Sequence, residues 1–343
     1  MLGVSGWMGI ASADQTDQSN PRLASAAAMA ARGNLDEAVR IYTSLLDAGW
    51  VSLDERERAH IGRGIVHFAK GEYDLAIADF TTAVALKPND PEAYYDRGLA
   101  YRQKGAMDAA LADYNITIRL SPRYGQAFNN RGYVYAVKGE LDLAFADFEK
   151  AIALDPRLAE AYSNRGAIFS TRGHFDRAIS DFGTSLRLDP NQARPHMNRA
   201  IAYFAKGDFR TALYDFQRAQ SLDRNNSYRQ LWLMLAQSKV GAINVDAEGP
   251  TPVASEVAQW PSPLLALFAG RESAQQILAM NGGAPVEREH TRECDTAFFV
   301  GEFELSHGQE QAGSELLHRA IEACPAFAPE AIAARSELAR ASR

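Results

Sequence analysis

A fixed period of 34 residues organises the chain between residues 57 and 226. Glycine, alanine, aromatic residues and proline each return at this step. The recurring residues are Gly71, Gly105, Gly139, Gly173 and Gly207, then Ala76, Ala110, Ala144, Ala178 and Ala212, then Phe80, Tyr114, Phe148, Phe182 and Phe216, and finally Pro88, Pro122, Pro156 and Pro190. A period of this length predicts stacked helical hairpins, each of which buries its apolar face against its neighbours.

The repeated unit resembles the tetratricopeptide repeat (TPR), as in the segment AYSNRGAIFSTRGHFDRAISDFGTSLRLDP at 161–190. The resemblance extends over five consecutive units. It implies an all-α fold, and we predict a right-handed superhelix (an α-solenoid) of about seven helical hairpins with a C-terminal capping helix. In this family the first helices of the hairpins line a concave groove that binds a peptide or protein partner.

The repeat pattern divides the chain into segments. At the start of the second repeat, Ser52 and Glu55 predict a capping box. The small residues Ala11, Ser12 and Ala13 fit the box before a secretory cleavage site, although no charged segment precedes them. The expected segments are 1–18, a disordered start or signal-peptide remnant; 19–56, a degenerate first repeat; 57–226, five regular repeats; 227–293, an irregular sixth unit with a helical insertion; 294–327, a last TPR-like unit; and 328–343, the capping helix.

A second periodic pattern joins arginine to aspartate within each repeat. Arginine recurs in the first helix and aspartate recurs sixteen residues later in the second helix. The pairs are Arg63 with Asp79, Arg97 with Asp113, Arg131 with Asp147, Arg165 with Asp181, and Arg199 with Asp215. These positions lie at similar height in an antiparallel hairpin, so we expect structural ion pairs rather than a phosphate site.

Charge and motif content argue against several functions. The formal net charge is −7, with 36 basic and 43 acidic residues, which disfavours nucleic acid as a partner. No apolar run approaches the roughly 20 residues that a spanning helix needs, so we expect no transmembrane segment. No HExxH pair, G-x-S-x-G elbow or phosphate-binding glycine loop occurs in the sequence. We therefore expect no enzyme activity, cofactor or metal.

The expected groove residues come from the first helices of the repeats. They are Tyr95, Arg102, Asn129, Asn130, Tyr133, Asn164, Arg194, Met197, Asn198 and Phe204. Asn130, Asn164 and Asn198 form a periodic row whose amides could hydrogen-bond the backbone of an extended peptide, while tyrosine and phenylalanine supply apolar contact area. The alternative is that these asparagines are simply favoured next to the Arg–Asp pairs.

The two cysteines lie at opposite ends of the last TPR-like unit. We expect Cys294 at the start of its first helix and Cys324 at the end of its second, so that antiparallel packing would bring them close enough for a disulfide. A pair placed in this way favours an oxidising compartment. Two alternatives stay open. The cysteines could be two buried reduced thiols, or they could form a metal site with His290, although these three residues do not have the spacing typical of zinc ligands.

The C-terminal part resembles bacterial cell-envelope TPR proteins of the NlpI type, through WPSPLLALFAG at 260–270 and CDTAFFVGEFELSHGQEQAGSELLHRAIEACP at 294–325. The resemblance implies a periplasmic scaffold that dimerises and brings a protease to cell-wall hydrolases. The sequence lacks an N-terminal cysteine that could carry a lipid. The alternatives are a cytoplasmic TPR adaptor or assembly factor and, more remotely, a metal protein or hydrolase centred on 290–324. A homodimer would use apolar side chains such as Trp260, Leu264 and Phe268.

Overall fold

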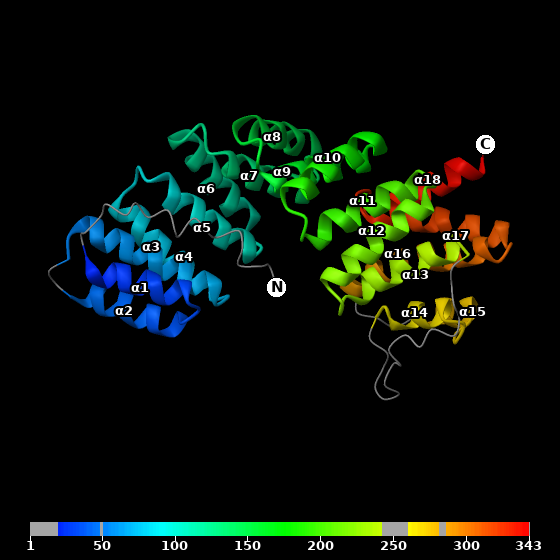
Figure 1. Ribbon diagram of the computed structural model, residues 1–343, viewed down its shortest axis with the longest axis horizontal. Coiled ribbons are helices and arrows are strands. Elements are labelled where there is room, and N and C mark those ends of the chain that lie inside the picture. Colours follow the sequence, from blue (N-terminus) through cyan, green and yellow to red (C-terminus); the bar gives the residue numbers. More distant parts are fainter. Residues whose placement is uncertain (1–19, 49–50, 242–259, 281–285, 343) are drawn as a thin grey trace. The chain divides into compact units, whose positions relative to one another are not determined.

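The computed structural model describes residues 20–48, 51–241, 260–280 and 286–342, and leaves the side chains of 286–291 undescribed (Figure 1). Contacts divide the chain into two compact units, residues 1–156 and 157–343, and each unit is considered separately. All regular elements in the described ranges are α-helices, as the sequence predicts. The expected N-terminal segment 1–18 lies outside these ranges.

The described residues of the first unit form four helical hairpins in chain order. They are α1 (Pro21–Ala31) with α2 (Leu35–Asp47), α3 (Leu53–Ala69) with α4 (Tyr73–Leu86), α5 (Pro91–Gln103) with α6 (Met107–Leu120), and α7 (Gly125–Val137) with α8 (Leu141–Leu154). The predicted capping box is confirmed at the start of α3, where the Ser52 hydroxyl accepts from the Glu55 amide and the Glu55 carboxylate accepts from the Ser52 amide.

Two glycines of the α5–α6 hairpin have different structural roles. Gly105, between α5 and α6, has a φ of 83°, a left-handed conformation that glycine adopts without a steric penalty. Gly98, inside α5, lies against the aromatic ring of Tyr114, and a Cβ at this position would come within 2.8 Å of that ring. The first glycine therefore permits the turn, and the second permits close packing of the two helices.

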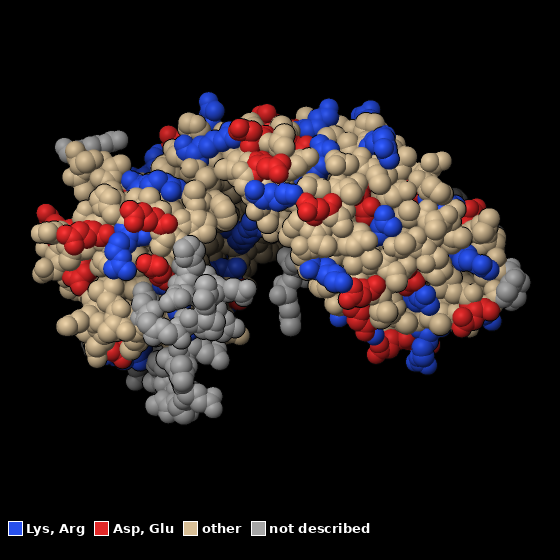
Figure 2. All heavy atoms as spheres, turned by 180° about the vertical axis from the view of Figure 1, so that it is seen from behind, with Lys and Arg blue, Asp and Glu red and all other residues tan. Residues whose placement is uncertain are grey.

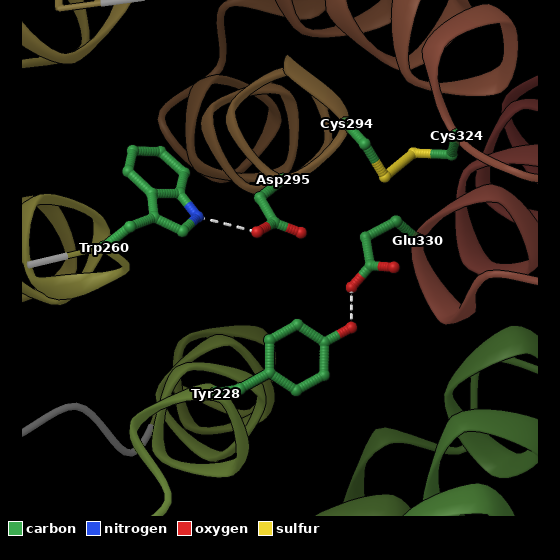
Figure 3. The surroundings of a disulfide bond; sticks show 6 residues. All are labelled: Tyr228, Trp260, Cys294, Asp295, Cys324 and Glu330. Atoms are coloured by element: carbon green, nitrogen blue, oxygen red, sulfur yellow. Dashed lines mark hydrogen bonds between the residues drawn. A yellow bond between two sulfur atoms is a disulfide. The ribbon is translucent and has the colours of Figure 1, made fainter. Parts of the chain in front are cut away.

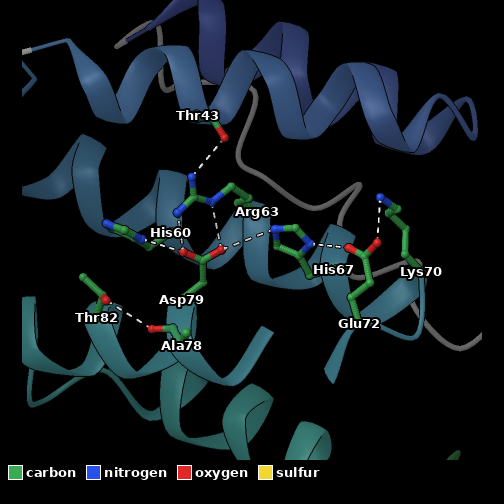
Figure 4. A network of polar contacts seen from close by, with 9 residues as sticks. All are labelled: Thr43, His60, Arg63, His67, Lys70, Glu72, Ala78, Asp79 and Thr82. Carbon is green, nitrogen blue, oxygen red and sulfur yellow. Dashed lines mark hydrogen bonds and ion pairs between the residues drawn. The ribbon is translucent and has the colours of Figure 1, made fainter. Parts of the chain in front are cut away.

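The predicted Arg–Asp pairs are confirmed in all five repeats. In each pair the arginine donates two hydrogen bonds of 2.6–2.9 Å to the two carboxylate oxygens of its aspartate. The aspartates are buried. Figure 4 shows the first pair, where Arg63 also donates to Thr43 of the preceding hairpin, at 2.9 Å. The arginines thus join helices both within a repeat and between repeats.

A row of lysine–aspartate pairs, which the sequence pattern did not reveal to us, links successive hairpins at the surface. Each lysine follows the first helix of one hairpin and reaches an aspartate in the first turn of the second helix of the preceding hairpin. These pairs are Lys70 with Asp36, Lys104 with Asp74, Lys138 with Asp108, and Lys206 with Asp176. Figure 2 shows basic and acidic side chains interspersed on one face of the molecule.

The second unit continues the repeat and then departs from it. Its helices are α9 (Ala159–Thr171), α10 (Phe175–Leu188), α11 (Ala193–Ala205), α12 (Phe209–Leu222), α13 (Ser227–Lys239), α14 (Ser262–Phe268), α15 (Ala274–Ala279), α16 (Val286–Ser306), α17 (Glu310–Ala323) and α18 (Pro329–Ala341). Trp232 of α13 is fully buried against Phe204, Phe216, Phe298 and Phe299. The core of this unit therefore joins the regular repeats to the hairpin of α16 and α17.

One predicted boundary in the second unit is wrong. Helix α16 begins at Val286, so Cys294 lies inside that helix rather than at the start of a helix. None of the described helices combines the length and apolar character that crossing a bilayer requires.

Candidate peptide-binding face

Helices α5 and α7, the first helices of successive hairpins, contact each other in the first unit. The face that they share carries four of the predicted groove residues, Tyr95 and Arg102 from α5 and Asn130 and Tyr133 from α7. The structure thus brings together residues that are separated by as many as 38 positions in the sequence.

A chain of polar contacts fixes the conformation of these four side chains. The Arg102 guanidinium donates a hydrogen bond of 2.6 Å to the Asn130 carbonyl oxygen. The Asn130 amide nitrogen donates one of 2.7 Å to the Tyr95 hydroxyl. The guanidinium carbon of Arg102 also lies 5.2 Å from the centre of the Tyr133 ring, within the range of a cation–π interaction. Arg102 is therefore held in place before any partner binds.

Arg102 differs from the periodic arginines because it has no carboxylate partner among the residues that the structure describes. Its guanidinium contacts the neutral Asn130 side chain and the Tyr133 ring. The five arginines of the Arg–Asp pairs are each neutralised by a buried aspartate. A partly exposed guanidinium without a carboxylate can form a bidentate, charge-assisted pair with a carboxylate from another molecule.

An aromatic and acidic group lies near the other end of α5. The rings of Tyr95 and Tyr124 are 4.9 Å apart, centre to centre. Burial, together with the nearby charges of Glu92 and Asp90, raises the pKa of Asp96 to about 8. Burial also raises the pKa of Tyr95 well above its ordinary value. Near neutral pH the Asp96 carboxyl is therefore largely protonated and can donate a hydrogen bond.

Replacement of Asp96 by asparagine should stabilise the first unit at alkaline pH. The folded-state pKa of about 8 lies above the ordinary value of 3.8, so the stability associated with a protonated Asp96 is lost as the pH rises between these values. The variant should match the parent near pH 4 and exceed it by about 1–2 kcal/mol above pH 8, less than the shift alone implies because water reaches part of this side chain. Urea unfolding at several pH values measures this difference, and a constant difference would contradict the assignment.

The expectation of a row of free asparagine amides is not met in the first unit. Both amide atoms of Asn130 are engaged, one with Arg102 and one with Tyr95, and Asn129 is buried. These asparagines are thus not available as expected for the backbone of a peptide. Asn130 is also not bonded to the Arg–Asp pairs in the contacts described, so its role is to position Arg102 and Tyr95.

In the second unit, two of the predicted groove residues belong to the core. Phe204 is fully buried and Met197 is 7% exposed. Helix α18 contacts α11 here, and Arg340 of α18 donates a hydrogen bond of 3.4 Å to the Phe204 carbonyl and another to that of Ala205. Met197 and Phe204 therefore cannot line an open groove. The sequence did not reveal this, because α18 is not part of the repeat.

The other groove residues of the second unit are at least partly accessible. Arg194 is exposed, and Asn164 and Asn198 are partly exposed.

The two cysteines form a disulfide in the structure, with sulfur atoms 2.13 Å apart and Cα atoms 4.8 Å apart (Figure 3). The bond joins α16 to the end of α17 and closes a loop of 30 residues. The side chain of His290, the third ligand of the metal alternative, lies outside the described residues.

Comparison with known families and structures identifies the repeats. A TPR repeat model matches residues 64–105. One tetratricopeptide repeat model matches residues 125–158 and 193–226, and another matches residues 91–124 and 159–192. Residues 64–226 therefore carry tetratricopeptide repeats, and the class of the protein is an α-solenoid of such repeats. A search of curated proteins found no match.

Solved structures share this architecture. The APC/C hetero-tetramer Cut9–Hcn1 has a chain with 23% identity and a TM-score of 0.57, and the match covers 63% of this chain and 42% of that one. The pilF protein of Pseudomonas aeruginosa has 18% identity and a TM-score of 0.51, and the match covers 55% of this chain and 86% of that one. MamA has 27% identity and a TM-score of 0.43, and the match covers 48% of this chain and 94% of that one. The first two likenesses show the fold.

Proposed function

We propose that this protein is a non-catalytic interaction scaffold that binds a peptide or protein segment on the α5–α7 face. Tetratricopeptide repeats typically mediate protein–protein interaction, which supports this class of function. The observation that carries the proposal is Arg102, a preorganised guanidinium without a carboxylate partner in the described chain. The partner segment supplies an acidic side chain or a C-terminal carboxylate to Arg102 and an apolar group to Tyr133.

The test uses peptides selected from a random display library against the purified protein. The selected peptides should carry aspartate, glutamate or a free C-terminus. The Arg102→Ala variant should bind them at least about tenfold more weakly, because a charge-assisted hydrogen bond to an ionised group is worth about 1.5–3 kcal/mol.

The matched control for this test is Arg119→Ala, which removes an exposed arginine from α6, the second helix of the same hairpin. Fluorescence anisotropy should give parent-like affinity for this control. If the selected peptides bind the Arg102→Ala variant as tightly as they bind the parent, Arg102 does not contact the partner and the proposed face is wrong.

We further propose that the scaffold works in an oxidising compartment such as the bacterial periplasm, where a protease or cell-wall hydrolase would be its partner. The Cys294–Cys324 disulfide supports this location, because disulfides persist in oxidising compartments. The kind of partner is inferred from the resemblance to NlpI-type proteins, and this partner stays a prediction. Localisation of a tagged, full-length protein by cell fractionation tests the compartment, and recovery with the cytosol would favour the cytoplasmic adaptor.

The residues that we expected to mediate a homodimer do not offer an open apolar surface. Leu264 is fully buried, Phe268 is 4% exposed, and Trp260 is only partly accessible. A homodimer of this scaffold would therefore need a different surface.

A further inference from the structure

Two buried carboxylates face the disulfide in the second unit (Figure 3). Asp295 follows Cys294 on α16, and Glu330 lies in the first turn of α18. Ligand atoms from Cys294, Asp295 and Glu330 all lie within 4.8 Å of one another. Helices α16 and α18 therefore bring a sulfur atom and carboxylate oxygen atoms to one point inside the protein, next to Cys324 at the end of α17.

Neither carboxylate has a cationic partner among the described residues. Asp295 accepts a hydrogen bond of 2.7 Å from the indole nitrogen of Trp260, and Glu330 accepts one from the Tyr228 hydroxyl. Both donors are neutral. Asp295 is 5% exposed and Glu330 is 2% exposed, so water offers little compensation for a negative charge at either position.

The other carboxylates that are almost completely buried in the described chain all face a lysine or arginine. These are Glu57 with Lys87, Asp79 with Arg63, Asp113 with Arg97, Asp147 with Arg131, Asp181 with Arg165, Asp215 with Arg199, and Glu302 with Lys239. Within the described ranges, acids that are almost completely buried are thus paired with cations except beside the two cysteines, whereas Asp96, which also has no cationic partner there, is partly accessible to water. A positive charge that is not part of the chain would complete the same pattern beside the cysteines.

We propose that, once the disulfide is reduced, Cys294, Cys324, Asp295 and Glu330 bind one Zn²⁺ ion. Four ligands of mixed sulfur and oxygen type suit tetrahedral zinc, and thiolates disfavour magnesium and calcium. Bonds of about 2.0–2.3 Å place tetrahedral ligand atoms roughly 3.3–3.8 Å apart. The ligand atoms of Cys294, Asp295 and Glu330 would move closer together, and the Cys324 sulfur would separate from that of Cys294 and approach the two carboxylates. Two thiolates and two carboxylates carry the same total charge as the four thiolates of a Cys₄ zinc site.

The disulfide and the zinc site exclude each other, because they use the same two sulfur atoms. Reduction by a dithiol takes two electrons and two protons from the reductant, which becomes a disulfide, and leaves two thiols in the protein. Zinc then displaces both thiol protons to solvent. The cross-link between α16 and α17 is thus covalent under oxidising conditions and metal-mediated under reducing conditions. This inference does not depend on the proposed α5–α7 binding face.

The experiment titrates the full-length protein with Zn²⁺ alone, in competition with a chromophoric zinc chelator. One sample is kept oxidised and the other is reduced with a phosphine under anaerobic conditions. The reduced protein should take up one Zn²⁺ ion per chain and the oxidised protein none. Glu330→Gln keeps the size of the side chain but removes the carboxylate, and should weaken zinc binding by roughly tenfold or more.

The matched control for this experiment is Glu322→Gln, which changes an exposed carboxylate of α17 near Cys324 and should bind zinc like the parent. Circular dichroism shows whether each variant keeps its helices. Three results would overturn the proposal: equal uptake by the oxidised protein, no uptake by the reduced protein, or uptake that a folded Glu330→Gln variant leaves unchanged.

Discussion

Replacement of Lys239 by methionine is expected to lower the free energy of unfolding of the second unit by about 3–5 kcal/mol, because it leaves a buried carboxylate without its cation. The ammonium of Lys239 lies 2.6 Å from a carboxylate oxygen of Glu302, and the Glu302 side chain is 0% exposed. Lys239 also reaches Glu337 of α18, at 3.4 Å. Urea unfolding, followed by the fluorescence of the buried Trp232, measures the loss.

The pH dependence of this loss provides a further check. Burial raises the pKa of Glu302 to about 7, so the carboxylate of the variant is largely protonated at pH 5. The loss should therefore be larger at pH 8 than at pH 5. Replacing Glu302 by leucine in the same chain should restore most of the stability, because no uncompensated charge remains.

The control for the Lys239 variant is Lys104→Met, which breaks a surface pair with Asp74. The Lys104 side chain is 50% exposed, and surface pairs contribute about 0–1 kcal/mol. If the two lysine variants lost equal stability, Lys239 would not be compensating the charge of Glu302.

Replacement of Asp147 by alanine is expected to destabilise the α7–α8 hairpin by about 3 kcal/mol or more. Asp147 accepts two hydrogen bonds of 2.8 Å from Arg131, whose side chain is only 19% exposed, between the rings of Phe128 and Tyr135. The variant leaves this guanidinium largely desolvated without its counter-ion. Since repeats unfold partly independently, hydrogen exchange of the α7 and α8 amides gives the local loss.

Asp108→Ala provides the comparison for this variant, because it removes an aspartate that pairs with Lys138 at the surface. The Asp108 side chain is 88% exposed, so protection of α7 and α8 should change little. Equal deprotection in the two aspartate variants would show that the buried Arg–Asp pairs do not hold the hairpins together.

The regular repeats and their ion pairs could be predicted because each feature recurs at a fixed step. A glycine such as Gly105 marks one turn weakly, but its recurrence every 34 residues gives the period of the hairpins. The same period predicts that Arg131 lies opposite Asp147. The Ser52–Glu55 capping box was predictable because it depends on neighbouring residues alone.

The candidate binding face was only partly predictable. The repeat pattern placed four residues on one face, Tyr95, Arg102, Asn130 and Tyr133. It gave no indication that the amide oxygen and the amide nitrogen of Asn130 are both hydrogen-bonded within the protein. Arg102 occurs at its repeat position in one repeat only, so the 34-residue period gives no indication of its role.

Contacts made outside the repeats could not be predicted in the same way. Helix α18 covers part of α11 through Arg340, which is 135 residues from Ala205. Glu330 lies on α18, which is not part of a repeat, so its approach to Asp295 follows no period. Such contacts depend on tertiary structure that the period does not encode.

Site-specific photocrosslinking in cells tests the central claim most directly, that a partner binds the α5–α7 face. A photoreactive phenylalanine analogue at Tyr133 reports on this face, and the same analogue at Tyr214, which is 66% exposed on α12, reports on a second helix of a hairpin. We predict a discrete adduct at Tyr133 that is lost with Arg102→Ala, and no such adduct at Tyr214. Equal adducts at the two positions, or an adduct at Tyr133 that persists with Arg102→Ala, would contradict the account.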